Sequence, residues 1–222
     1  MDDALDRLRA ALGSARSLTG SPPPFDADTP PADPVRLFAD WFAAAVDAGV
    51  PEPHAVTLST VDAAGVPDAR VLVLKDVTDD GSWTFASSAS SAKGRQLADR
   101  PVAALTFSWQ AQARAIRLRG SVTTEPEPVR RADFAARSAS ARAVALAGGQ
   151  SEPLNNIVEL HATVEAAADR LRREPDAVAD DWTVWALHPD LIEFWQGDVS
   201  REHLRLQYRR SGDGWSAARL RP

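Results

Sequence analysis

The sequence predicts an α+β protein in which helices surround an antiparallel β-sheet that is closed, or nearly closed, into a barrel. Three observations lead to this fold class. Short segments rich in β-branched and aromatic residues follow one another closely in the middle of the chain and again at its end. Turn residues such as Asp79-Asp80-Gly81 separate them, which favours hairpins between antiparallel neighbours. Segments with helical spacing of apolar residues lie before and between the two groups of strands.

The N-terminal part of the chain is predicted to be a helix followed by an arm. Leucines at helical spacing predict a short helix over residues 2–13. A dense run of prolines follows and prevents regular helix, so we expect an arm that lies on the body of the protein. Asp33 and Pro34 then predict the N-cap and first position of the next helix. The expected division is therefore residues 1–33, the helix and Pro-rich arm, and residues 34–222, the barrel domain.

The barrel domain shows no internal repeat and no clean boundary. Runs or alternations of apolar residues predict its strands, at residues 54–61, 70–75, 83–87, 102–109, 115–123, 182–188, 191–196, 204–209 and 215–220. Helical spacing predicts its helices, at residues 35–50, 90–98, 126–137, 140–147 and 155–173.

The composition excludes several classes of function. The chain has 222 residues, of which 44% are hydrophobic, which is enough for a sizeable core. A net charge of −6 argues against nucleic acid as a partner. The chain has no cysteine, so disulfides and thiolate chemistry are excluded. We expect no membrane span and no secretory signal, because apolar runs of the necessary length are absent, and we therefore expect a cytoplasmic protein.

Several familiar site motifs are also missing. There is no G-x-G-x-x-G after a strand and no G-x-x-x-x-G-K-[ST], so dinucleotide-binding and P-loop sites have little support. The four histidines are far apart in sequence, and we expect no metal site. The aspartate pairs at residues 79–80 and 180–181 are interpreted as solvated turn residues rather than as acid–base pairs.

Two cationic motifs lie in the middle of the chain. In Arg70-Val71-Leu72-Val73-Leu74-Lys75, the apolar residues predict a buried strand, and strict alternation places Arg70 and Lys75 on opposite faces. Solvated charges at the strand ends are the preferred interpretation from these residues alone, with anion binding as the alternative. The serine-rich stretch Ser87 to Ser91 precedes a helix that carries Lys93 in its first turn. It is either an ordinary N-cap or a phosphate site, since free N–H groups and hydroxyls bind anions.

Two further motifs come later in the chain. Gly148-Gly149-Gln150-Ser151 is interpreted as a helix C-cap and turn in preference to a ligand site. The stretch Glu193-Phe194-Trp195-Gln196-Gly197 is followed by Arg201, His203 and Arg205 at alternate positions. Alternation is expected to place these three side chains on one side of an extended segment. A row of this kind, with Trp195 available for stacking, suits a flat anionic ligand.

The order of these motifs resembles the pyridoxamine 5′-phosphate oxidase family of FMN flavoproteins. The sequence of R-x-x-x-x-K, the serine-rich loop with S-x-K, Q-S, and E-F-W-Q-G followed by R-x-H-x-R carries the resemblance, over about residues 34–222. The resemblance implies a split β-barrel homodimer with FMN at the subunit interface and a small aromatic heterocycle as substrate.

The resemblance also implies the site residues. Those expected to bind FMN are Arg70, Val71, Leu72, Lys75, Ala86, Ser87, Lys93, Gln150, Ser151, Trp195 and Arg205. Those expected to bind substrate are Lys75, Arg137, Arg201 and His203, and the last two are expected to lie over the substrate ring as the catalytic pair.

The chain departs from the family pattern at four positions. Asp133 and Ala141 replace a tyrosine and a serine that bind the substrate phosphate, and Ala115 and Ala92 replace a glutamine and an arginine near the flavin. An aspartate at the first position is expected to repel a phosphate dianion. The N-terminal arm resembles a branch of the family that aromatises dihydrophenazine carboxylates.

The expected activity is therefore an FMN-dependent oxidase that uses O₂. The first expectation for its substrate is pyridoxamine or pyridoxine 5′-phosphate, with pyridoxal 5′-phosphate as product. A dihydrophenazine carboxylate is the alternative within this class. Two other classes stay open: a flavin- or deazaflavin-binding reductase or carrier without oxidase turnover, and a structural dimer without a cofactor.

Overall fold

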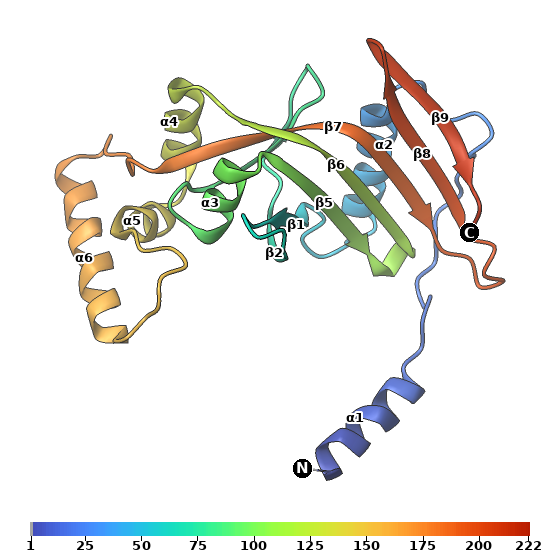
Figure 1. The fold of residues 1–222 in the computed structure, drawn as a ribbon, viewed down its shortest axis with the longest axis horizontal. Coiled ribbons are helices and arrows are strands. Elements are labelled where there is room, and N and C mark those ends of the chain that lie inside the picture. The colour runs from blue at the N-terminus through green and yellow to red at the C-terminus, as the bar shows by residue number, and fades with distance from the viewer. Residues whose placement is uncertain (1) are drawn as a thin grey trace.

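A nine-stranded antiparallel sheet curls into half a barrel in the computed structural model, which describes residues 2–222 (Figure 1). Its strands are β1 (Ala55–Val61), β2 (Pro67–Val73), β3 (Asp76–Val77), β4 (Trp83–Ser88), β5 (Val102–Trp109), β6 (Arg114–Thr124), β7 (Trp182–Gln196), β8 (Leu204–Ser211) and β9 (Gly214–Leu220). The helices of the described chain are α1 (Asp2–Ser14), α2 (Pro34–Asp47), α3 (Ala92–Asp99), α4 (Glu127–Ala136), α5 (Ala139–Ala147) and α6 (Ile157–Arg173). The predicted α+β class and barrel-type sheet are confirmed.

Strand β7 is the long strand on which the sheet branches. One edge pairs with β6 along most of its length, while the other pairs first with β4 and then with β8. The prediction of two separate strands at 182–188 and 191–196 is therefore wrong in one respect, because the two segments form a single strand. Pro189 lies where the second partner changes, and the register with β6 shifts between Arg119 and Gly120. A Cβ on Gly120 would lie 1.9 Å from the carbonyl oxygen of His188, so this close approach requires glycine.

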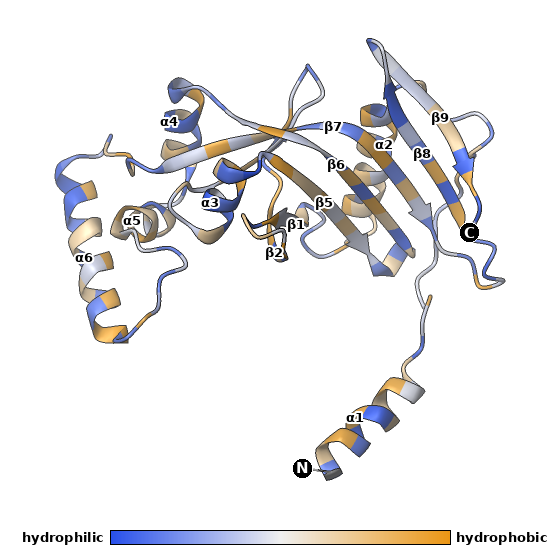
Figure 2. Cartoon of the chain, in the orientation of Figure 1, coloured by the Kyte–Doolittle hydropathy of each residue, from blue (hydrophilic) through white to orange (hydrophobic). Residues whose placement is uncertain are grey.

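Helix α2 fills the inside of the curl. The side chain of Asp33 accepts a hydrogen bond from the backbone N–H of Val35 at 2.9 Å, and Pro34 occupies the first turn, which confirms the predicted start. The helix buries Phe38 and Trp41 against the sheet, where the ring of Phe38 lies 4.4 Å from that of Trp83. Each large apolar side chain buried in this way stabilises the fold by about 1.5–3 kcal/mol. Figure 2 shows the matching alternation of apolar and polar residues along the strands.

The N-terminal arm lies on the body of the protein, as predicted. The hydroxyl of Tyr208 donates a hydrogen bond to the carbonyl of Pro31 at 2.8 Å, and Arg114 donates to the carbonyl of Pro23 at 3.2 Å. The predicted first helix is present as α1, which projects away from the sheet (Figure 1). Its leucines are exposed, Leu12 by 66%.

Strand β2 corrects one expectation. The segment 70–75 was expected to be a buried strand, but β2 ends at Val73, and Val71 and Val73 are 70% and 41% exposed. The cause is its place at one edge of the sheet, where nothing in the described chain covers that face. Lys75 lies beyond the strand, and its backbone N–H donates to the carbonyl of Thr84. The short strand β3 follows and had no counterpart in the prediction.

Helices α4, α5 and α6 form a second layer beside the start of β7 (Figure 1). Phe134 of α4 is fully buried and its ring packs edge-on against Trp182, with the ring centres 5.7 Å apart. Within residues 2–222, no helix is both long enough and apolar enough to cross a membrane.

Candidate functional site

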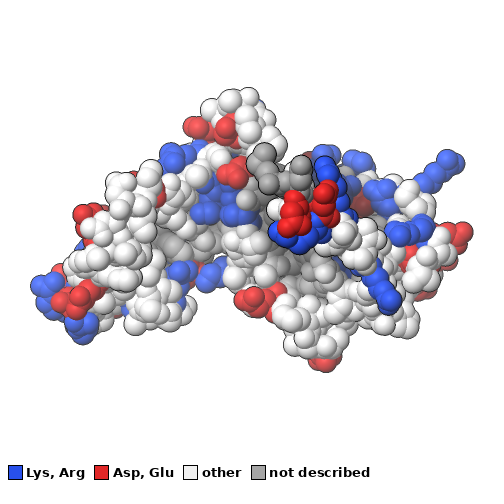
Figure 3. Space-filling view, turned by 90° about the horizontal axis from the view of Figure 1, so that it is seen from below, with Lys and Arg blue, Asp and Glu red and all other residues white. Residues whose placement is uncertain are grey.

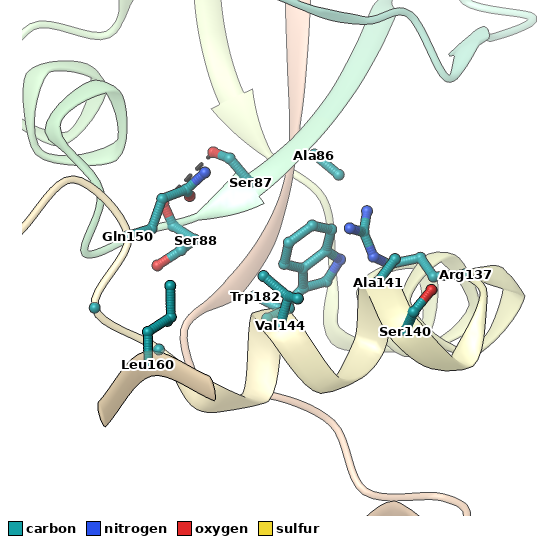
Figure 4. A pocket seen from close by; sticks show the side chains of 13 residues that line it. Ala86, Ser87, Ser88, Arg137, Ser140, Ala141, Val144, Gln150, Leu160 and Trp182 are labelled. Carbon is teal, nitrogen blue, oxygen red and sulfur yellow. Dashed lines mark hydrogen bonds between the residues drawn. The ribbon is translucent and has the colours of Figure 1, made fainter. Parts of the chain in front are cut away.

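A cavity of about 610 Å³ opens between β4, α5 and the start of β7. It brings together four of the predicted site residues, Ala86, Ser87, Arg137 and Gln150. In Figure 4, the ring of Trp182 lies between the side chains of Gln150 and Arg137. Gln150 and Ser151 follow the glycine that ends α5, whose φ of +72° confirms the predicted C-cap.

A chain of polar contacts runs under this cavity. The Nζ of Lys75 lies 2.9 Å from Oδ1 of Asp133, whose Oδ2 accepts a hydrogen bond from the indole N–H of Trp182, also at 2.9 Å. The guanidinium of Arg137 stacks on the Trp182 ring, 4.2 Å from its centre. Burial lowers the pKa of Arg137, and the charge of Asp133 partly opposes that effect. The Nε of Arg137 is buried without a hydrogen-bond partner among the described residues.

The serine-rich loop borders the same cavity. Ser91 caps α3 by accepting from the N–H of Gly94, as an ordinary N-cap does. The carboxylate of Asp181 accepts hydrogen bonds from the hydroxyls of Ser88 and Ser90. Asp181 was expected to be a solvated turn residue, but it is only partly exposed and holds the serine loop against the start of β7.

Lys93 lies on α3, directly after the serine loop, and Arg70 contacts the same helix through Gln96. Arg70 donates to the hydroxyl of Thr60 at 2.6 Å and to the side chain of Gln96 at 3.1 Å, and it pairs with Asp68. Lys93 is only 9% exposed and donates to the hydroxyl of Ser91 at 3.2 Å. Burial, and then the positive charge of Arg70, lower the pKa of Lys93. Two cations held this close favour an anion between or beside them.

The remaining predicted residues lie near the other end of β7. The rings of Trp195 and His203 have their centres 5.1 Å apart, and Arg205 pairs with Trp195 across β7 and β8. The expected row of Arg201, His203 and Arg205 on one extended segment is wrong, because β8 begins at Leu204 and Arg201 has a φ of +70°. Arg201 and His203 are brought near Trp195 by a loop instead of by strand alternation.

The predicted residues thus form two groups, which we name by their places. The serine-loop end comprises the cavity, the loop 87–91, Arg70, Lys93 and the exposed strand β2 with Val71 and Leu72. The C-terminal end comprises Trp195, the loop 197–203 and Arg205. Trp182 and Trp195 lie near opposite ends of the 15-residue strand β7, and an extended strand of that length spans on the order of 40 Å. One small ligand does not contact both Trp182 and Trp195 of a single chain.

The donors at the serine-loop end fit a flavin mononucleotide. Its phosphate needs cations and hydroxyl donors, which Lys93, Arg70 and the serines supply. Figure 3 shows Lys and Arg side chains gathered in the recessed middle of one face. In residues 2–222, no three His, Cys, Asp or Glu side chains gather as a metal site would require.

Sequence reasoning missed two residues of this site. Trp182 forms part of the cavity wall, although only Trp195 was expected to meet a ligand. Its position directly after Asp180-Asp181, at the start of a strand, was the available signal. Glu193, the first residue of the E-F-W-Q-G motif, is 3% exposed and joins two arginines, a role that its spacing alone does not indicate.

Family models match most of the chain. Residues 42–170 match the model described as pyridoxamine 5′-phosphate oxidase. Residues 182–222 match the model of the pyridoxine 5′-phosphate oxidase C-terminal dimerisation region.

Known proteins give the same result. The pyridoxine/pyridoxamine 5′-phosphate oxidase of Thermosynechococcus vestitus is 42% identical over 190 residues, which cover 86% of this chain and 89% of that protein. The protein of the same name from Ectopseudomonas mendocina is 41% identical over 194 residues, which cover 86% and 90%.

Two solved structures resemble the fold. PhzG from Burkholderia lata 383, in complex with tetrahydrophenazine-1-carboxylic acid, superposes with a TM-score of 0.84 at 28% identity and covers 91% of this chain and 100% of that one. A pyridoxamine 5′-phosphate oxidase-related FMN-binding protein from Nostoc punctiforme superposes with a TM-score of 0.69, covering 85% and 97%. At 19% identity this second likeness concerns the fold alone.

Proposed function

Because the chain belongs to the pyridoxamine 5′-phosphate oxidase family, we propose that it is an FMN-dependent oxidase whose active sites each combine the serine-loop end of one chain with the C-terminal end of a second copy. The separation of the two ends along β7 carries this proposal. A homodimer can bring the two groups together, because a two-fold axis can place the serine-loop end of each chain beside the C-terminal end of its partner. The match of residues 182–222 to a dimerisation region and the exposed valines of β2 support it.

Each group of residues then has a distinct task. Lys93, Arg70 and the serine loop hold the phosphate of FMN, with Val71 and Leu72 of β2 beside it. Trp195 and Arg205 of the partner copy border the flavin ring. FMN, when bound, supplies the redox chemistry, accepting a hydride from the substrate and passing electrons to O₂. The protein orients the substrate over the ring and excludes water, and we assign this role to Arg201 and His203 of the loop 197–203.

Subunit complementation tests the shared site. One variant combines Arg70→Ala with Lys93→Ala, and the other combines Trp195→Ala with Arg205→Ala. Each alone is expected to bind no FMN. When the two are unfolded and refolded together, random pairing yields mixed dimers with one intact site, so about a quarter of all sites should bind FMN. Absence of any recovery in a refolded mixture that is dimeric contradicts the shared site.

Pyridoxamine or pyridoxine 5′-phosphate is the first substrate that we propose. Two relatives named as oxidases of these compounds are more than 40% identical over 86% of the chain. Arg137 lines the cavity that would receive the substrate phosphate, and Lys75 pairs with Asp133, which contacts Trp182 of the cavity wall. Oxidation to pyridoxal 5′-phosphate with uptake of O₂ is the corresponding assay.

A dihydrophenazine carboxylate is the second candidate, and one contact favours it. Asp133 pairs with Lys75 at 2.9 Å, so Lys75, Asp133 and Arg137 together carry one net positive charge. That charge suits a carboxylate better than a phosphate dianion. Ala141, which lines the cavity, offers no hydroxyl to a phosphate. The structural neighbour PhzG holds a tetrahydrophenazine carboxylate.

Steady-state oxidation of both compounds by the purified FMN-loaded protein separates the two candidates. Turnover of the phosphate ester with a specificity constant at least tenfold higher supports the first, and the reverse ratio supports the second. If the protein turns over neither compound, both candidate activities are wrong. The rate at which air reoxidises the chemically reduced protein then decides the class, since slow reoxidation indicates a flavin-binding reductase or carrier.

A further inference from the structure

The carboxylate of Glu193 is buried on the face of the sheet that points away from the core. Its neighbours Ile192 and Phe194 are fully buried on the core side, so alternation puts Glu193 on the opposite face. Glu193 is nevertheless only 3% exposed. A buried carboxylate is unfavourable unless it is paired and hydrogen-bonded.

Two arginines from neighbouring strands satisfy this carboxylate. Arg117 of β6 donates from Nη2 to Oε2 at 2.6 Å, and Arg205 of β8 donates from Nε to Oε1 at 2.8 Å. Gln207 donates to Oε2 at 3.3 Å. Arg117 and Gln207 lie directly opposite Glu193 in the two strand pairs, so the register of β6, β7 and β8 sets the geometry.

The electrostatics show that these contacts dominate the state of Glu193. Burial acts to raise its pKa, but the hydrogen bonds from Arg205 and Arg117 and their charges outweigh it and hold the pKa below the ordinary value. In return, the hydrogen bond to Glu193 raises the pKa of Arg205. The cluster therefore stays fully ionised at neutral pH, with two positive charges and one negative charge.

The cluster borders a cavity of about 310 Å³ that Trp195 also lines. Arg205 uses Nε for Glu193 and Nη1 for the carbonyl of Arg221, at 3.1 Å. Arg117 uses Nη2 for Glu193 and is about half exposed. Each guanidinium is thus fixed by part of its donors, and further N–H groups remain for a ligand on the same face.

We propose that Glu193 is a positioning residue that holds the guanidinium groups of Arg205 and Arg117 ready for the flavin beside Trp195. This inference rests on the proposed FMN site, and it adds Arg117 as a flavin-facing cation. Without Glu193, two long side chains would have to be ordered when the ligand binds, at a cost in side-chain entropy.

Substitution Glu193→Gln tests the proposal with a nearly identical shape. A glutamine amide has one acceptor oxygen in place of two. Its NH₂ group would face an N–H donor of one arginine, and that arginine would lose its hydrogen bond. The affinity for FMN, measured by titration of flavin fluorescence, should fall roughly tenfold. In NMR spectra of the cofactor-free protein, the Arg205 Nε–H should lose its protection from solvent exchange. A general loss of stability would not affect this one group selectively.

The matched control is Asp190→Asn. Asp190 lies near Glu193 on β7 but forms a looser, exposed pair with Arg119 at 3.9 Å, so FMN affinity should stay within twofold of wild type. Arg205→Lys is a second variant. A lysine keeps the charge but has a single ammonium group, which cannot contact Glu193 and a ligand in the planar geometry of a guanidinium, so the affinity for FMN should again fall roughly tenfold. This variant tests the same positioning role if Glu193→Gln does not fold.

The outcomes separate two failures. Equal FMN affinity in wild type and Glu193→Gln overturns the positioning role, while the proposed function stands. A wild-type protein that binds no FMN overturns the proposed function and, with it, the flavin-facing role of the cluster. A lower affinity in Glu193→Gln with unchanged solvent exchange of the side-chain N–H groups of both Arg205 and Arg117 also overturns the proposal, because neither arginine would then have been released.

Discussion

The serine-loop end and the C-terminal end of β7 hold their charged groups in different ways. At the serine-loop end, Lys93 is buried beside Arg70, and the cavity behind the loop is already formed. At the C-terminal end, Arg201 is exposed in a loop with a positive φ, and Arg205 is fixed mainly by Glu193. One end has a concave pocket with the cations Lys93 and Arg70 nearby, and the other is a face with an aromatic ring and a cluster of two arginines and one glutamate.

This difference indicates a division of labour. A concave cationic pocket holds the polar tail of a cofactor, whereas an open face with Trp195 suits a flat ring. The two would have to come from different chains, since β7 keeps them apart within one chain. The following predictions test this division, beginning with the change expected to have the largest effect.

Introducing a charge on β2 should dissociate the proposed homodimer and so separate the serine-loop end of one chain from the C-terminal end of the other. Val71 is 70% exposed, and Val71→Asp would bury a carboxylate in the proposed dimer interface. We expect a monomer in analytical ultracentrifugation and at least a hundredfold loss of FMN affinity. Val158→Asp, at a 67% exposed position on α6, is the control and should remain dimeric. A dimeric Val71→Asp protein with normal FMN affinity would contradict the interface.

Removing one buried cation should affect the cofactor phosphate alone. Lys93→Ala is expected to weaken FMN binding by about ten- to a hundredfold, because a charge-assisted contact to phosphate is lost. Binding of riboflavin, which has no phosphate, should hardly change. Arg100→Ala removes an exposed cation just beyond α3 and should affect neither ligand. If riboflavin weakens as much as FMN, the phosphate does not lie at the serine-loop end.

Neutralising Asp133 should change the choice of substrate. Asp133→Asn frees Lys75 from its ion pair, so the affinity for pyridoxal 5′-phosphate should rise roughly tenfold in calorimetric titration, while that for pyridoxal stays the same. The amide still accepts from Trp182, which preserves the packing of Arg137. Asp213→Asn on the distant β8–β9 hairpin is the control. An unchanged affinity for the phosphate ester would mean that Asp133 does not select against phosphate.

Lowering the pH should reduce the stability of the protein through protonation of Glu193. This is the smallest effect of the four predictions. The pKa of Glu193 is held below the ordinary value of 4.5, so its contribution to stability is present above that value and is lost as the pH falls through the lower folded pKa. Urea unfolding between pH 5 and about pH 3 should therefore show a steeper loss of stability in wild type than in Glu193→Gln. Parallel profiles would show that Glu193 does not titrate in this way.

Much of the fold followed from local pattern. Asp33-Pro34 marked the start of α2, Gly148 marked the end of α5, and the hairpin of β1 and β2 was predicted correctly, whereas the expected hairpin of residues 70–75 with 83–87 is wrong because β4 pairs with β3. The errors came where a distant segment decided the outcome. Pro189 suggests a break between two strands, but β7 continues past it, with Asp190 as an extra residue opposite Arg119 and Gly120 of β6.

The candidate site shows the same limit. The residue types and their order indicated the family, and the structure brings Ala86, Ser87, Arg137 and Gln150 to one cavity. Alternation failed for Arg201 and His203, because period-two reasoning holds only inside a strand and β8 begins after them. No spacing rule indicates that Lys75 meets Asp133 across the fold.

The sequence by itself determined which elements form, which family the motifs resemble and which side chains are available to bind an anion and a flat ring. These properties depend on neighbours in the chain, through periodicity, capping and turn chemistry. Only the tertiary structure decided that the site residues divide between two ends of β7, that Trp182 and Asp181 support the serine loop and cavity, and that Glu193 unites two arginines. The reason is physical: strand pairing joins residues far apart in sequence, and their charges interact through space at distances that spacing along the chain does not specify.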